Sequence, residues 1–112
     1  MKRALFIGRW QPLHPGHKWL FNQKLEQDIP ILIAVRDTPI GDTNPYSTEE
    51  VIVNLEKEYE NEVGSGMVKV IPIPDIESVN YGRGVGYEIN EFIPPKDIGQ
   101  ISATEIRKNL KK

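Results

Sequence analysis

The sequence of 112 residues contains no cysteine, which excludes disulfide bonds, thiolate catalysis and cysteine-ligated zinc. It lacks any apolar run near the roughly 20 residues that cross a bilayer, so we expect no membrane partner. It has no strong excess of charge, with a formal net charge of −2, whereas nucleic-acid-binding faces are usually basic. These absences, and a length suited to one core, predict a single cytoplasmic domain over residues 1–112 that binds neither nucleic acid nor membrane.

Apolar runs alternate with helical patterns along the chain. The near-continuous apolar runs that predict strands cover residues 4–7, 29–35, 67–73 and, more weakly, 87–93. Such runs are typical of parallel strands that are covered on both faces. Helical spacing follows from residue 18, capping boxes begin further helices at Ser47 and Ser102, and residues 64–66 should end the second helix. We therefore predict a small α/β fold with a mainly parallel sheet of about four strands.

The two histidines of the chain, His14 and His17, follow the first predicted strand. Ligands of parallel α/β sheets bind beyond the carboxyl ends of the strands. There Gly16 allows close approach of the backbone, and the imidazoles would join free N–H groups at a helix N-terminus, where anions bind. The pattern predicts a polyphosphate site, and the capping box at Ser102 predicts a second one. A surface pair or a helix cap is the alternative interpretation, and two imidazoles without a third ligand disfavour zinc.

Other polar residues follow strand ends or begin helices. The cations placed there are Arg9, Lys18, Arg36, Arg83 and Arg107. Together they could neutralise a triphosphate and the charge that develops as pyrophosphate leaves, although each alone is typical of a solvated surface. Residues 82–86 favour either a loop over the ligand or a phosphate cradle. Asp37, Asp42 and Asp75 could help to hold magnesium, which often relies chiefly on substrate phosphates and water.

The aromatic residues near these segments divide into two groups. Tyr46 and Tyr81 are candidates for stacking on a base. We expect Trp19 in the core, because it lies in the first turn of a predicted helix.

Four motifs together resemble a known family. They are Gly8-Arg9-Trp10-Gln11-Pro12-Leu13-His14-Pro15-Gly16-His17, Asn44-Pro45-Tyr46-Ser47, Ile71-Pro72-Ile73-Pro74-Asp75-Ile76 and Ile101-Ser102-Ala103-Thr104-Glu105-Ile106-Arg107. In this order they resemble the HxGH nucleotidyltransferase superfamily, and they look most like its archaeal-type nicotinamide-nucleotide adenylyltransferases, in a shortened form. The HxGH element alone also marks cytidylyltransferases and phosphopantetheine adenylyltransferases. The Gly-Arg-aromatic-Gln-Pro lead-in and the Ile-Ser-Ala-Thr-Glu-Ile-Arg ending narrow the choice.

The resemblance implies a Rossmann-like, three-layer fold and a reaction without a covalent enzyme intermediate. A nucleotidyl group would pass from a nucleoside triphosphate, with Mg²⁺, to a phosphate on a small acceptor. The implied catalytic residues are His14, His17 and Arg107. The implied nucleotide contacts are Gly8, Arg9, Gln11, Gly16, Lys18, Ser102 and Thr104. Contacts to the acceptor or base are expected from Trp10, Arg36, Asn44, Tyr46, Tyr81 and Arg83.

Two departures from the family leave alternatives open. Val51 stands where relatives usually have an arginine, and the chain is short between Ile76 and Ile101, where relatives carry another strand. We expect adenylyl transfer from ATP to an acceptor such as nicotinamide mononucleotide. The alternatives are cytidylyl transfer from CTP to a phosphorylated alcohol or sugar, and an inactive nucleotide-binding module. A homodimer is one expectation, because a small sheet gains from burying an edge or an apolar face.

Overall fold

A computed structural model describes residues 2–82 and 86–94. These residues form a parallel sheet in the order β1-β2-β3. The strands are β1 (Ala4–Gly8), β2 (Ile31–Asp37) and β3 (Val68–Pro74). The helices are α1 (Pro15–Leu25), α2 (Thr48–Glu58) and α3 (Glu60–Ser65). The predicted α/β fold with a parallel sheet is confirmed.

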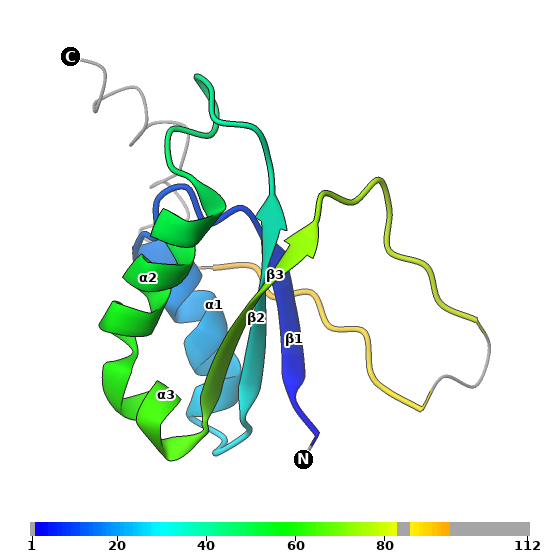
Figure 1. The fold of residues 1–112 in the computed structure, drawn as a ribbon. Helices are drawn as coiled ribbons and strands as arrows, with labels where there is room; N and C mark the ends of the chain where they lie inside the picture. Colours follow the sequence, from blue (N-terminus) through cyan, green and yellow to red (C-terminus); the bar gives the residue numbers. More distant parts are fainter. Residues whose placement is uncertain (1, 83–85, 95–112) are drawn as a thin grey trace.

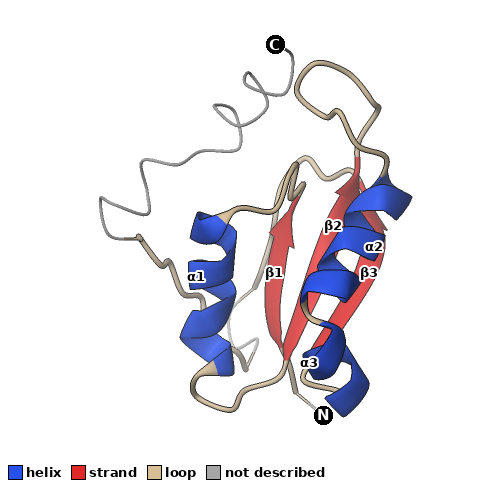
Figure 2. Cartoon of the chain, turned by 90° about the vertical axis from the view of Figure 1, so that its left-hand side faces the viewer, coloured by secondary structure: helices blue, strands red, loops and turns tan. Residues whose placement is uncertain are grey.

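The helices α1 and α2 cover the same face of the sheet (Figure 2). Each lies in a connection between neighbouring parallel strands, and such connections are right-handed. Because β1, β2 and β3 follow one another in a single direction across the sheet, right-handed connections place every helix on one side. Within the described part of the chain the helices therefore form one layer, and the expected second helical layer is not found there.

The core lies between this face of the sheet and the helices. Side chains alternate along a strand, and on β2 the residues Ile31, Ile33 and Val35 point toward the helices and are fully buried. Phe21 of α1 and Leu55 of α2 pack against them. The other face carries no described helix, and Leu5 on β1 is 56% exposed. Of each continuous apolar run, the described core thus buries mainly the side chains that point toward the helices.

The predicted strand over residues 87–93 is wrong. Residues 86–94 form no strand and instead return past β1 toward α1 (Figure 1), where the Lys24 ammonium lies 6.0 Å from the centre of the Phe92 ring. Ile89 and Ile93 are exposed. This segment buries too little apolar surface to be held against the sheet.

Two boundaries also differ from the prediction. The second helix does not run on to residues 64–66, because α2 ends at Glu58 and a separate α3 ends before Gly66, which has a left-handed φ of 85°. Strand β3 continues through Pro72, which pairs with Val35. Proline is tolerated there because β3 is an edge of the described sheet. No helix among the described residues is long and apolar enough to cross a membrane.

Candidate functional site

The two histidines cap the start of α1, and each ring accepts a hydrogen bond from a backbone N–H group of the same turn. His14 is the N-cap residue, and its Nδ1 accepts a hydrogen bond from the Gly16 N–H at 3.1 Å. The Nδ1 atom of His17 accepts in turn from the His14 N–H at 3.4 Å. The two rings are stacked, with centroids 3.7 Å apart and planes 25° apart. The His-Pro-Gly-His sequence therefore folds as a reciprocal capping box.

These hydrogen bonds determine which ring nitrogens are donors. A neutral imidazole has one donor and one acceptor nitrogen, and both Nδ1 atoms accept from the backbone, so each ring carries its proton on Nε2. Burial lowers the pKa of His14, and burial together with the charge of His14 lowers the pKa of His17 to about 3. Near neutral pH the pair is therefore uncharged and offers two Nε2–H donors, which suit phosphate oxygens.

The backbone of this helix start is already occupied, contrary to our expectation of free N–H groups. Pro15 has no N–H, the Gly16 N–H binds the His14 ring, and the N–H groups of His17 and Lys18 both bind the His14 carbonyl. A cap satisfies such donors, which otherwise lack partners. An anion here would meet imidazole N–H groups rather than the first backbone amides of α1.

Trp10 is a core residue that supports His17, rather than an exposed ring available for an acceptor or a base. Its side chain is buried at a left-handed φ of 53°. The indole lies edge-on to His17 at 4.9 Å, and its N–H donates to the Ala34 carbonyl at 3.2 Å. A Cβ atom on Gly8 would lie 2.9 Å from this ring. Trp19, which we expected in the core, is only partly buried and lies outside the core cluster.

The buried amide of Gln11 fastens the β1–α1 loop to the β2–α2 loop. Its Nε2 donates to the Tyr46 carbonyl at 2.8 Å, and its Oε1 accepts from the Tyr46 N–H at 2.9 Å. The Tyr46 side chain is partly buried and packs against the core cluster. Two residues expected to contact the ligand therefore also hold the two loops together above the strand ends (Figure 1).

The cations of the sequence pattern divide between two places. Arg9 donates to the Asn44 side-chain oxygen at 3.3 Å, and Arg36 forms an ion pair with Asp75 at 2.7 Å, so both lie at the carboxyl ends of the strands. Lys18 instead pairs with Glu58 of α2 at 2.6 Å. Because this pair is exposed, it contributes little stability. Lys18 is directed toward α2 and not toward the histidines' ligand side.

The aspartates expected near magnesium have protein partners. Asp37 accepts a hydrogen bond from the Thr48 hydroxyl at 2.8 Å, and Asp75 holds Arg36. Nowhere in residues 2–82 and 86–94 do three histidine, aspartate or glutamate side chains gather as metal ligands. The carboxylates and imidazoles of the described residues are therefore not arranged to bind a magnesium ion without a substrate.

The remaining residues of the predicted site lie elsewhere. Tyr81 is 63% exposed, on a segment that leads away from the sheet in Figure 1. Those outside the described residues are Arg83, Ser102, Thr104 and Arg107. The motif of residues 101–107 therefore stays a prediction.

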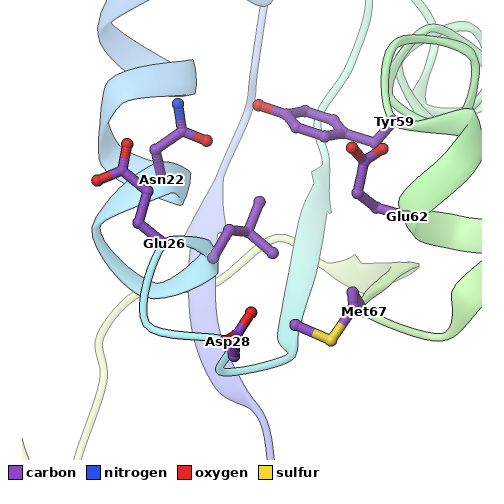
Figure 3. A pocket seen from close by; sticks show the side chains of 7 residues that line it. Asn22, Glu26, Asp28, Tyr59, Glu62 and Met67 are labelled. Atoms are coloured by element: carbon purple, nitrogen blue, oxygen red, sulfur yellow. The ribbon is translucent and has the colours of Figure 1, made fainter.

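A pocket of about 280 Å³ lies at the opposite end of α1 from His14 (Figure 3). Its lining residues are Asn22, Leu25, Glu26, Asp28, Tyr59, Glu62 and Met67. Burial, followed by the charges of Glu58 and Glu62, raises the pKa of Tyr59 to about 12. None of the predicted site residues lines this pocket, so it is separate from the candidate site.

The chain is similar to archaeal nicotinamide-nucleotide adenylyltransferases. It is 35% identical to that of Ignicoccus hospitalis over 77 residues, which are 66% of this chain and 45% of the relative. The identity is 31% over 98 residues for Caldivirga maquilingensis and 35% over 99 residues for Pyrobaculum neutrophilum, in both cases 85% of this chain and 53% of the relative. The chain thus spans about half the length of these relatives. No protein-family model matches it.

The contact between Gly8 and Trp10 predicts a large effect of a single methyl group. Because Trp10 is held by His17 and Ala34, its ring cannot move aside freely, so Gly8→Ala should lower the free energy of unfolding by about 1–3 kcal/mol. Urea unfolding followed by tryptophan fluorescence measures this change. Gly41→Ala is the matched control, since nothing lies within 4 Å of its added Cβ. Equal stabilities of the two variants would contradict the proposed packing.

The lowered pKa of His17 predicts that acid destabilises the fold. The pKa of His17 is about 3 in the folded chain, against an ordinary value of 6.5. Between these pH values the folded chain binds fewer protons at His17 than the unfolded chain, so the free energy of unfolding should fall as the pH drops below 6.5. The slope for one proton is at most about 1.4 kcal/mol per pH unit. Urea unfolding between pH 7.5 and 5.5 measures it. His17→Asn should flatten the slope, and an unchanged slope would refute the assignment to His17.

Proposed function

The chain belongs to the family of the archaeal nicotinamide-nucleotide adenylyltransferases, and from this premise we propose that it transfers the adenylyl group of ATP to a small phosphate-bearing acceptor such as nicotinamide mononucleotide. The observation that carries the proposal is the stacked pair of neutral imidazoles at the start of α1. Two fixed N–H donors, placed beyond the end of β1, are what a phosphoryl-type transfer needs from a protein.

In the proposed reaction, a phosphate oxygen of the acceptor attacks the α-phosphorus of ATP. A new phosphorus–oxygen bond forms, the bond from the α-phosphorus to the bridging oxygen breaks, and pyrophosphate leaves with the electron pair. The Nε2–H groups of His14 and His17 donate to triphosphate oxygens on which charge increases in the transition state. They are already held by the cap, so they need no reorganisation, which is the basis of electrostatic catalysis by fixed donors.

The cations complete the proposal. Arg9 follows β1 and is held by Asn44, so its guanidinium is available near the same strand ends. By resemblance, Ser102, Thr104 and Arg107 would bind the β- and γ-phosphates. Magnesium would arrive on the triphosphate oxygens, because Asp37 and Asp75 are already held by Thr48 and Arg36. The protein's contribution is thus alignment and charge stabilisation.

We expect pyrophosphate release with ATP and nicotinamide mononucleotide in the presence of magnesium. CTP with glycerol 3-phosphate is the matched comparison, because it tests the cytidylyltransferase alternative under the same assay. Release with the second pair alone would replace the adenylyl assignment. Tight binding of ATP without release of pyrophosphate with any acceptor would instead indicate the inactive binding module.

Two substitutions of His17 distinguish the capping role of its Nδ1 atom from the donor role of its Nε2–H group. Asparagine places an acceptor near Nδ1, so His17→Asn keeps the cap but loses the Nε2–H donor, and kcat should fall about 10²–10³-fold. Glutamine reaches the position of Nε2, so His17→Gln should retain more kcat and less stability than His17→Asn. Steady-state kinetics and thermal unfolding measure the two effects. The reverse order for kcat would contradict the donor role of Nε2.

A further inference from the structure

An arginine–aspartate pair joins the carboxyl ends of β2 and β3. The Nε and Nη2 atoms of Arg36 both donate to one oxygen of Asp75, at 3.0 and 2.7 Å. Two charge-assisted hydrogen bonds to one carboxylate fix the orientation of a guanidinium. The Arg36 side chain nevertheless remains 30% exposed, and its Nη1 atom makes no hydrogen bond to a described residue. Arg36 is therefore oriented and still has donors for a ligand.

A second guanidinium lies at the same edge of the sheet. Arg9, at the end of β1, is held by Asn44, and its charge adds to the effect of Arg36, whose hydrogen bond is the largest cause of the lowered pKa of Asp75. Arg9 and Arg36 thus both lie near enough to the Asp75 carboxylate to stabilise its charged form. Asp37, also at the end of β2, is held by the Thr48 hydroxyl of α2, and the two guanidinium groups supply the local positive charge that attracts an anion.

The position of Arg36 distinguishes it from the histidines. Val35 is fully buried toward the helices, and successive side chains of a strand point to opposite faces, so Arg36 points to the face away from α1. The capped histidines begin α1 on the helix-covered face (Figure 2). In an in-line displacement the attacking and leaving oxygens lie on opposite sides of the phosphorus. A triphosphate on the histidines would leave the Arg36 side of the strand ends for the attacking group.

We infer that Arg36 binds the phosphate monoester of the acceptor, and that Asp75 is a positioning residue that holds its guanidinium, not a magnesium ligand. The inference rests on the proposed function for the identity of the acceptor. Arginine suits this task because its planar donors match phosphate oxygens in pairs. A lysine in this place would bind as a point charge without the same orientation.

The test compares one acceptor with and without its phosphate. Calorimetry measures the affinity for nicotinamide mononucleotide and for nicotinamide riboside, which lacks the phosphate. Arg36→Gln should weaken the mononucleotide about 10–100-fold, as expected for hydrogen bonds to a charged group, and should leave the affinities for the riboside and for ATP unchanged. Lys69→Gln is the matched control, because it removes a cation from the same sheet face away from the strand ends. Equal weakening by both variants, or no weakening by Arg36→Gln, overturns the inference.

The positioning role of Asp75 needs a different readout. Asp75→Asn should raise KM for the acceptor while kcat changes little, because the donors remain but lose their fixed orientation. The exchange Arg36→Asp with Asp75→Arg restores an ion pair but moves the guanidinium to residue 75, so it should not regain affinity for the mononucleotide. Full recovery of that affinity would show that the place of the guanidinium does not matter and would overturn the inference.

Failure of the proposed function is separable from failure of this site. If the wild-type chain binds none of the acceptors, the proposed function fails, and inorganic phosphate becomes the probe. Phosphate binding that is lost in Arg36→Gln and kept in Lys69→Gln then supports the site. Phosphate binding that does not depend on Arg36, or none at all, overturns it.

Discussion

The reciprocal cap between His14 and His17 is the interaction on which the candidate site depends. It satisfies the first N–H groups of α1, stacks the two rings and selects the Nε2 tautomer of both. A substitution at either position therefore changes the helix start and the donor pair together. Behind the cap, Trp10 fills the space beside Gly8 and supports His17 from the core side. The geometry of the donors is thus built into the packing of the domain.

Two further contacts join the loops that follow β1 and β2, close to this cap. Gln11 binds the backbone of Tyr46 from both sides of its amide, and Arg9 reaches Asn44 in the same loop. Both contacts join residues 35 positions apart. They fasten the loop after β1 to the loop after β2 at the carboxyl ends of the strands. Loops positioned by a rigid scaffold are where binding groups are usually found.

Local signals in the sequence predicted the elements that depend on local interactions. The Ser47–Glu50 capping box is formed at the start of α2, and the three stronger apolar runs are strands. The weak run over residues 87–93 failed because strand formation depends on a partner and a core, which the sequence does not display. The same limit explains Trp10 and Lys18. Their residue types allowed a ligand contact, but only the tertiary arrangement shows that Trp10 packs in the core and Lys18 pairs with α2.

The distribution of charge explains how a slightly acidic chain can offer an anion site. Burial keeps His14 and His17 uncharged, so two donors are present without two buried cations that repel each other. The permanent positive charge is carried instead by Arg9, which is held by Asn44, and by Arg36, which is paired with Asp75. A protonated ring would lose the Nδ1 acceptor that the cap uses. The cap therefore favours two neutral donors, and the arginines carry the positive charge of the site.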